Sequence, residues 1–407
     1  MQKGAIEVVK TLSEKGHIAY FAGGWVRDYL MGHESDDIDI ATSALPEDLQ
    51  EIFLKTIPVG IAFGIVVVVV EGHQYEVATF RRDLDYVDGR HPIGIERCSP
   101  EEDAKRRDFT INGMFYDPLQ NRIYDYVDGQ RDLHLRTIRA IGDADLRFTE
   151  DRLRMIRAIR YATRFDFIID ELTKESIIRH SASLLPSVSI ERIWQEFSKM
   201  AKFNTFGKSL YMLYRFGLLT AIFPALKEVP QNEIVARCKK IEQLPKGLPL
   251  VGVMLEICPC TSREVALAMC KFLKLSGKEV KFALALFDAR LKFGDKDLAS
   301  CERFEVAQLL AHPDSEAILT FIGHDYNQQA RKVFFADIAE IRASLATHIT
   351  RLTEGRPLIS AVDLQKIGVQ NGPLMGELLQ MAARISVNED IARKEDLLES
   401  KSFRKLF

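Results

Sequence analysis

The chain has 407 residues, enough for two to four domains that each bury a core. Hydrophobic residues make up 47% of it and charged residues 28%, which excludes disordered and fibrous classes of protein. A net charge of −3 excludes a generally basic coat for nucleic acid and leaves a local basic surface open. The longest apolar run, at 65–70, is too short to cross a bilayer, and the six cysteines are scattered. We therefore expect a cytoplasmic protein with reduced thiols and no membrane partner.

Helices and strands alternate in the first 120 or so residues. Amphipathic and β-branched patterns predict, in chain order, a helix at 4–15, a strand at 17–22, a helix at 24–31, a strand at 37–42, a helix opening at Leu45-Pro46, and a hairpin of strands at 65–70 and 74–80. These elements predict a small, mostly antiparallel sheet. Residues 83–102 have no clear periodicity, so we expect a mobile loop there, either a plain connector or a functional lid.

Strand patterns nearly vanish from Glu150 onward, and helical periodicity replaces them. The segment EDRLRMIRAIRYATRF places its apolar residues along one helical stripe, and prolines interrupt the helices that follow. We therefore expect an α+β protein with an N-terminal head and an all-α remainder. Domain boundaries are predicted near residues 140, 200 and 310.

The segment FAGGWVRDYLMGHESDDIDIAT combines residue types that suit the phosphates of a nucleotide. Gly23 and Gly24 leave the backbone bare beside a ligand, at a helix start that attracts phosphate. Arg27 adds a planar fork of donors for phosphate oxygens. Asp37 and Asp39 alternate along the predicted strand, so both carboxylates project from one face and can share hard metal ions such as Mg²⁺. Alone, such a pair is more often a turn or surface feature, but the glycines and arginine upstream favour phosphoryl transfer.

Two further sites hold candidate ligands for a nucleotide or a metal ion. In KRRDFTIN, Arg107 suits a triphosphate, and Asp108 and Asn112 suit ribose hydroxyls, although such basic runs are usually solvated surface. Glu76, on the neighbouring predicted strand, is either a third metal carboxylate or a salt-bridge partner of Arg81.

Residues 131–164 hold nine arginines against five acids, which predicts a positive surface for a polyanion. Within this range, Asp151, Arg154 and Arg157 recur at a spacing that lines one stripe of a helix. An ion-pair ladder within the helix is the default interpretation. The alternative is a protein template for bases, in which a carboxylate accepts from the amino group of cytosine or adenine and an arginine donates to the adjacent ring nitrogen. Uracil and guanine present a carbonyl and a ring N–H on the same edge, which is the opposite pattern of donors and acceptors.

An ordered series of motifs resembles a known family. The segments GGWVRD, DDIDIAT, YEVATFR, KRRDFTINGM, EDRLRMIRAIRYATRF and ERIWQE are similar to the motif set of class II CCA-adding tRNA nucleotidyltransferases, within the polymerase beta-like superfamily. The resemblance is dense over about the first half of the chain. It implies a nucleotidyltransferase head at 1–140, a neck with the base-template helix at 141–200, a helical body at 201–310 and a helical tail at 311–407.

The resemblance also implies an activity. The enzyme would add C, C and A to the 3′ end of tRNA from CTP and ATP, without a nucleic-acid template, by two-metal phosphoryl transfer with Mg²⁺ and release of pyrophosphate. The body and tail would hold the acceptor arm of tRNA, and no obligate protein partner is expected. The implied residue roles are catalytic metal binding by Asp37 and Asp39, triphosphate contacts by Gly24, Arg27 and Arg107, base reading by Asp151 and Arg154, and further nucleotide contacts by Arg157 and Arg160.

Relatives with other products remain alternatives. GIAFG, at 60–64, lacks the basic stretch of bacterial poly(A) polymerases, and the presence of RRDLDYVDGRHP disfavours an enzyme that adds only the two cytidines. Enzymes that add only the final adenosine keep this loop and are the runner-up. Two other classes are a silent RNA-binding module, against which the intact Asp37 and Asp39 argue, and a small-molecule nucleotidyltransferase, which has no use for the arginine-rich neck.

Overall fold

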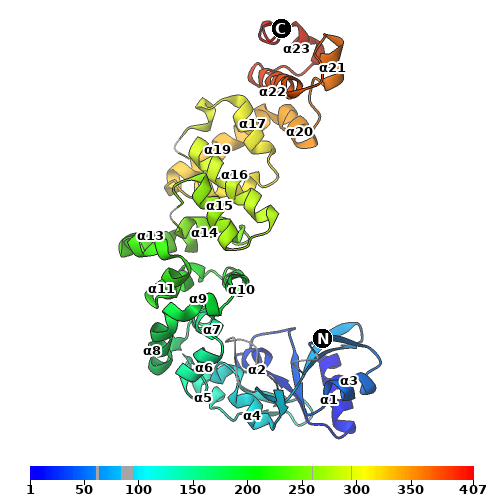
Figure 1. Cartoon of the computed structure of the whole chain (residues 1–407), viewed down its shortest axis with the longest axis vertical. Helices are drawn as coiled ribbons and strands as arrows, with labels where there is room; N and C mark the ends of the chain where they lie inside the picture. The colour runs from blue at the N-terminus through cyan, green and yellow to red at the C-terminus, as the bar shows by residue number, and fades with distance from the viewer. Residues whose placement is uncertain (61–63, 84–94, 259, 295) are drawn as a thin grey trace. The chain divides into compact units, whose positions relative to one another are not determined.

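A computed structural model of the chain describes residues 1–60, 64–83, 95–258, 260–294 and 296–407 (Figure 1). The chain forms two compact units, Met1–Glu242 and Gln243–Phe407. All strands that the structure describes belong to the first unit, and the second is built of helices. The expected α+β class is therefore confirmed. A finer division near residues 140, 200 and 310 stays a prediction.

Seven strands form the main sheet of the first unit, in the order β3-β4-β5-β2-β1-β8-β9. Neighbouring strands run antiparallel except β2 and β5, which run parallel. The strands are β1 (Ala19–Ala22), β2 (Asp39–Thr42), β3 (Thr56–Gly60), β4 (Ile65–Val70), β5 (His73–Thr79), β8 (Phe115–Asp117) and β9 (Arg122–Tyr124).

The hairpin of β4 and β5 forms where the sequence predicts it. β4 reads IVVVVV, and branched side chains favour the extended backbone of a strand. Val70 pairs with His73, so Glu71 and Gly72 make the turn, with φ of 51° and 79°. Positive φ at both positions of a two-residue loop matches the right-handed twist of the strands.

Side chains alternate along the strands, which gives the sheet two apolar faces. Phe21 and Ile40 pack on one face, in a core with residues of the three helices α1 (Gln2–Glu14), α2 (Gly24–Leu30) and α3 (Pro46–Ile52). Ala22 and Ala41 pack on the other face, against Ala104 of α4 (Pro100–Lys105). The end of β1 is thus held from both sides.

Residues 83–102 are not a loop throughout, so the sequence-based expectation was partly wrong. β6 (Arg81–Asp83) pairs antiparallel with β7 (Ile95–Arg97), and α4 follows at once. Ser99 caps α4, because its hydroxyl accepts from the backbone of Glu102, whose carboxylate accepts from the backbone of Ser99. Three-residue strands carry too little periodicity to be seen in the sequence. The choice between a plain connector and a functional lid stays open for residues 84–94, which lie outside the described residues.

The remainder of the first unit is mainly helical. α7 (Leu153–Phe165) buries the predicted apolar stripe and packs against α10 (Ile190–Met200) and α11 (Phe206–Arg215). The other elements are α5 (Gly129–His134), β10 (Thr137–Ile138), α6 (Ala144–Glu150), β11 (Ile168–Ile169), α8 (Glu171–His180), α9 (Leu184–Ser187), α12 (Leu218–Ile222) and α13 (Gln231–Glu242).

The second unit consists of helices, and the apolar clusters among its described residues include one with Leu364 and Phe403 and one with Phe304 and Leu345. In the ranges that the structure describes, no helix has the length and apolarity to cross a membrane. The helices are α14 (Leu250–Ile257), α15 (Arg263–Phe272), α16 (Gly277–Phe293), α17 (Arg303–Ala311), α18 (Ser315–Gly323), α19 (Gln328–Ser344), α20 (Ala346–Glu354), α21 (Ala361–Lys366), α22 (Pro373–Asn388), α23 (Lys394–Glu399) and α24 (Lys401–Arg404).

Candidate active site

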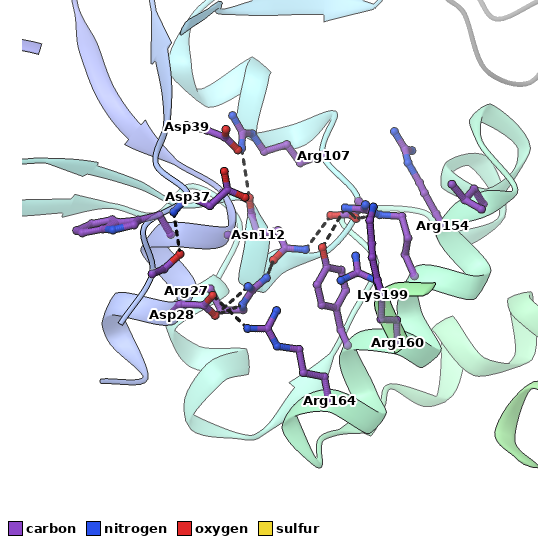
Figure 2. Close-up of a pocket in the computed structure, with 18 of the residues that line it drawn as sticks. Arg27, Asp28, Asp37, Asp39, Arg107, Asn112, Arg154, Arg160, Arg164 and Lys199 are labelled. Carbon is purple, nitrogen blue, oxygen red and sulfur yellow. Dashed lines mark hydrogen bonds and ion pairs between the residues drawn. The ribbon is translucent and has the colours of Figure 1, made fainter. Parts of the chain in front are cut away.

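One cavity of about 740 Å³ in the first unit brings together every predicted site residue except Glu76, the alternative metal ligand, and Figure 2 shows part of its lining. Ten basic and five acidic side chains line it, an excess of positive charge that suits a polyanion. The predicted residues at its wall are Gly23, Gly24, Arg27, Asp37, Asp39, Arg107, Asp108, Asn112, Asp151, Arg154, Arg157 and Arg160. Their individual roles stay predictions.

The pairing of β1 with β2 places the glycine turn beside the carboxylates. Ala22 lies opposite Asp39 in the antiparallel register, and Gly23 follows directly. Gly23 has φ of 65° and ψ of −124°, which glycine adopts without steric cost. A Cβ at this position would lie 3.2 Å from Nη1 of Arg107. Glycine therefore lets the Arg107 guanidinium lie against the turn.

The two predicted metal carboxylates reach the cavity from different local structures. β2 begins at Asp39, so Asp37 precedes the strand and the two do not alternate along it as expected. Glu76 immediately precedes Val77, which pairs with Ile40 in the parallel register, so Glu76 lies beside Asp39. Burial by the surrounding protein, and then repulsion from Asp37 and Glu76, raises the pKa of Asp39 to about 6, although its side chain opens to the cavity.

The side chain of Arg27 contacts two polar residues and two aromatic rings. Its Nε and Nη2 lie 2.9 Å and 2.8 Å from Oδ1 of Asp28, and its Nη1 donates to Oδ1 of Asn112 at 2.6 Å. The guanidinium also lies over the rings of Tyr161 and Phe165, 5.1 Å and 4.7 Å from their centroids. Only 3% of Arg27 is exposed. The orientation of its donors is therefore set before any ligand binds.

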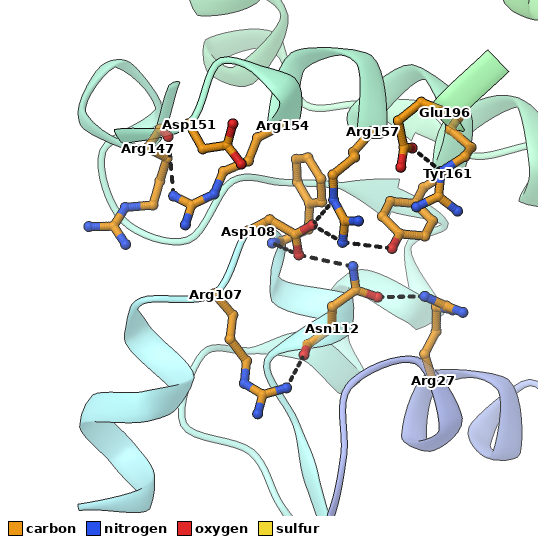
Figure 3. Close-up of polar contacts among 12 residues, drawn as sticks. Arg27, Arg107, Asp108, Asn112, Arg147, Asp151, Arg154, Arg157, Tyr161 and Glu196 are labelled. Carbon is orange, nitrogen blue, oxygen red and sulfur yellow. Dashed lines mark hydrogen bonds and ion pairs between the residues drawn. The ribbon is translucent and has the colours of Figure 1, made fainter. Parts of the chain in front are cut away.

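A chain of hydrogen bonds joins the head to α7 through Asp108 and Asn112 (Figure 3). Nε of Arg157 donates to Oδ2 of Asp108 at 2.8 Å, and Nδ2 of Asn112 donates to Oδ1 at 3.1 Å. Burial alone would raise the pKa of Asp108, but Arg157, Asn112 and Arg154 together lower it to about 2. Burial also opposes the charge of Arg157, yet Tyr161 and Asp108 raise its pKa. Both predicted ribose ligands thus already have protein partners.

Asp151 and Arg154 do not share a helical stripe, which corrects the spacing argument. α6 ends at Glu150 and α7 begins at Leu153, so Asp151 lies in the junction between the two helices. Arg154 donates to the carboxylate of Glu150 at 2.6 Å, four residues earlier, as in an ion-pair ladder. Asp151 instead pairs with Arg192 of α10, at 2.7 Å and 3.1 Å.

The sequence patterns assign no role to several residues that line this cavity or contact its wall. Arg160, a predicted nucleotide contact, donates from Nε to Glu196 at 2.6 Å, and Glu196, only 2% exposed, also accepts from Lys199. Glu196 belongs to the ERIWQE segment, a motif of the series above to which the sequence assigns no individual residue roles. Asp28, Arg164, Arg192, Lys199, Lys202 and Phe203 also line the cavity.

Comparisons with known proteins identify relatives of this chain. Residues 19–139 match the family described as poly A polymerase head domain, and residues 166–229 match the family described as probable RNA and SrmB-binding site of polymerase A. The CCA-adding enzyme of Bacillus licheniformis is 38% identical over 281 residues, covering 69% of this chain and 70% of that protein. The CCA-adding enzyme of Geobacillus thermodenitrificans is 45% identical over 225 residues, covering 55% of each chain.

A solved structure extends the similarity to the whole chain. The crystal structure of Bacillus stearothermophilus CCA-adding enzyme in complex with CTP is similar with a TM-score of 0.78 and 30% identity, covering 99% of this chain and 98% of that chain. Its fold therefore matches both the sheet-bearing head and the helices that follow. The resemblance seen in the motifs is confirmed: the chain belongs to the CCA-adding enzymes, a family of tRNA nucleotidyltransferases.

Proposed function

We propose that this chain adds C, C and A to the 3′ end of tRNA from CTP and ATP, without a nucleic-acid template. One observation carries the proposal: a single cavity is lined by a glycine turn, by the carboxylates of Asp37 and Asp39, by an excess of basic side chains, and by Asp151 and Arg154. Such a cavity offers ligands for metal ions, for a triphosphate and for a base. The relative of similar fold was crystallised with CTP. An enzyme that adds only the final adenosine is the alternative.

Asp37 and Asp39 would hold Mg²⁺. In the described ranges no group of three or more His, Cys, Asp or Glu side chains is arranged to hold a metal ion. Two carboxylates are enough for Mg²⁺, because this ion usually takes one or two carboxylates together with substrate phosphates. The repulsion that Asp39 experiences from Asp37 and Glu76 is what a cation would relieve. When bound, two such ions activate the attacking hydroxyl and neutralise charge on the triphosphate.

The triphosphate would lie against the glycine turn. Gly23 and Gly24 present backbone without side chains, and Arg27 and Arg107 flank the turn with planar donors. The 3′ oxygen of tRNA would attack the α-phosphorus, the bond to the β-phosphate oxygen would break, and pyrophosphate would leave. The positive wall of the cavity would favour the polyanionic transition state.

The base would meet Asp151 and Arg154, with Arg157 and Arg160 as further nucleotide contacts. A carboxylate acceptor beside an arginine donor matches the amino group and ring nitrogen of cytosine and adenine. Uracil and guanine would leave buried polar groups mispaired, at a cost of roughly 1–3 kcal/mol each. The helical body at 201–310 and tail at 311–407 would hold the acceptor arm of tRNA.

Incorporation into tRNA that lacks its last three nucleotides tests the proposal. Wild-type protein with CTP and ATP should extend this tRNA by three nucleotides, and Asp39→Asn should extend it by none. Asp36→Asn is the matched control, because Asp36 is exposed and close in sequence but does not line the cavity. Full turnover by a folded Asp39→Asn protein would exclude the metal assignment. Binding of tRNA without extension by wild type would leave only an RNA-binding module.

A further inference from the structure

The residue that contacts the Asp151 carboxylate most closely comes from another helix. Arg192 of α10 donates from Nη1 to Oδ1 at 3.1 Å and from Nη2 to Oδ2 at 2.7 Å, so its fork holds both oxygens. Both side chains are largely buried, at 18% and 19% exposed. A bidentate pair of this kind fixes the plane of the carboxylate as well as its position.

The hydrogen bonds that Asp151 accepts within the protein occupy most of the acceptor positions of its carboxylate. Oδ1 accepts from the backbone N–H of Leu153 at 3.1 Å as well as from Arg192. Oδ2 accepts from Arg192 alone among the described residues. A carboxylate offers about four acceptor positions, so roughly one, on Oδ2, remains for a ligand.

Three of the five N–H groups of Arg154 already donate to protein acceptors. Nη1 donates to the backbone oxygen of Arg147 at 3.1 Å (Figure 3). It also donates to Oε2 of Glu150 at 2.6 Å, and Nη2 donates to the backbone oxygen of Arg106 at 3.2 Å. A guanidinium has five N–H groups. One N–H of Nη2 and the N–H of Nε therefore remain for a ligand. No ion pair joins Arg154 to Asp151 in the ranges described, so separate partners hold each of them.

We propose that Arg192 is a positioning residue that determines base choice: its fork turns the one open acceptor of Asp151 toward the base. This inference rests on the proposed reading of bases by Asp151 and Arg154. An oriented acceptor beside an oriented donor accepts cytosine or adenine. Without the fork, the carboxylate can rotate and present its other oxygen, and the distinction from uracil and guanine weakens. Lysine at this position keeps the charge but cannot hold both oxygens.

Competing incorporation of CTP and UTP tests this role. The variants are Arg192→Lys and Arg192→Ala, and the readout is the ratio of kcat/KM for the two nucleotides on tRNA that lacks its last three nucleotides. We expect both variants to lower the preference for CTP roughly 10-fold, the effect of mispairing one buried group. Added methylguanidinium should restore the preference in Arg192→Ala but not in Asp151→Ala.

A control and a reference variant separate the possible outcomes. Arg139→Ala removes an arginine that pairs with Asp132 and Asp170 outside the cavity, so it should keep full preference for CTP. If Asp151→Ala loses the preference while both Arg192 variants keep it, the role of Arg192 is overturned and the base template stands. If Asp151→Ala keeps the preference as well, the template itself is wrong. Full preference in Arg192→Lys alone would also overturn the need for the fork.

Discussion

Asp108→Asn tests the buried link between the head and α7. The carboxylate accepts a hydrogen bond from Nε of Arg157 at 2.8 Å and forms an ion pair with its Nη2 at 2.7 Å, and only 8% of Asp108 is exposed. Asparagine keeps the size of the side chain and an acceptor oxygen, but it removes the charge that faces the guanidinium. The change therefore isolates the electrostatic part of this contact.

The pKa of Asp108 gives the magnitude of the expected loss. It falls from the ordinary value of 3.8 to about 2 in the folded protein, and each unit corresponds to about 1.4 kcal/mol, so the charge stabilises the fold by about 2 kcal/mol. Breaking a fully buried pair costs about 3–5 kcal/mol. Arg157 is 29% exposed and can be hydrated when its partner is lost, so we expect a loss of about 2 kcal/mol.

This contribution depends on pH in a defined direction. Because the pKa is lower in the folded state, protonation of Asp108 favours the unfolded chain. The stabilisation is complete above pH ~4, falls to about half near pH 3 and is lost toward pH 2. The difference in stability between wild type and Asp108→Asn should shrink over the same interval.

Urea unfolding followed by tryptophan fluorescence measures this difference. Both tryptophans, Trp25 and Trp194, lie in the first unit, so their signal reports that unit. Asp166→Asn is the matched control: its carboxylate pairs with Lys208 at the surface and is 75% exposed, so this variant should lose much less stability than Asp108→Asn. Equal losses in the two variants at neutral pH, or a loss in Asp108→Asn that does not change down to pH ~3, would refute the reasoning.

Three further predictions concern the cavity. Gly23→Ala and Gly142→Ala should each destabilise the fold by about 1–3 kcal/mol, because both positions have positive φ. Only the Cβ of Gly23→Ala comes close to Arg107, so only this variant should raise the KM for CTP. Equal KM values for the two variants would contradict this geometry. Glu76→Gln should raise the Mg²⁺ concentration for half-maximal activity by about 10-fold or more if Glu76 is a third ligand, and an unchanged Mg²⁺ titration would leave it outside the metal site. Asp151→Ala and Arg154→Ala should relax base choice and retain some transfer; full selectivity of both in single-nucleotide incorporation would reject the template.

Local features of the head could be predicted from the sequence because their signals lie within a few residues. The glycine pair, the hairpin of β4 and β5 and the apolar stripe of α7 all lie where the patterns placed them. Period-two and period-3.6 patterns carry this information directly. The short strands β6 and β7 were missed, since three residues define no period.

The partners of the charged residues could not be predicted in the same way. Asp151 pairs with Arg192, 41 residues later, and Arg160 pairs with Glu196, 36 residues later. Spacing along the chain shows which residues carry charge, but the packing of α10 on α7 decides which of them meet. The expected helical stripe failed for Asp151 for a similar reason, because α6 ends just before it.

The most direct test of the proposed activity uses three acceptors, tRNAs that lack three, two or one of their last nucleotides. Each acceptor is incubated with wild-type protein and a single nucleotide triphosphate. The account predicts that CTP extends the first by two nucleotides and the second by one, and that ATP alone extends the third, by one. Extension of only the third acceptor would show an enzyme that adds the final adenosine alone. Repeated addition of A to any acceptor would indicate a poly(A) polymerase and contradict the central claim.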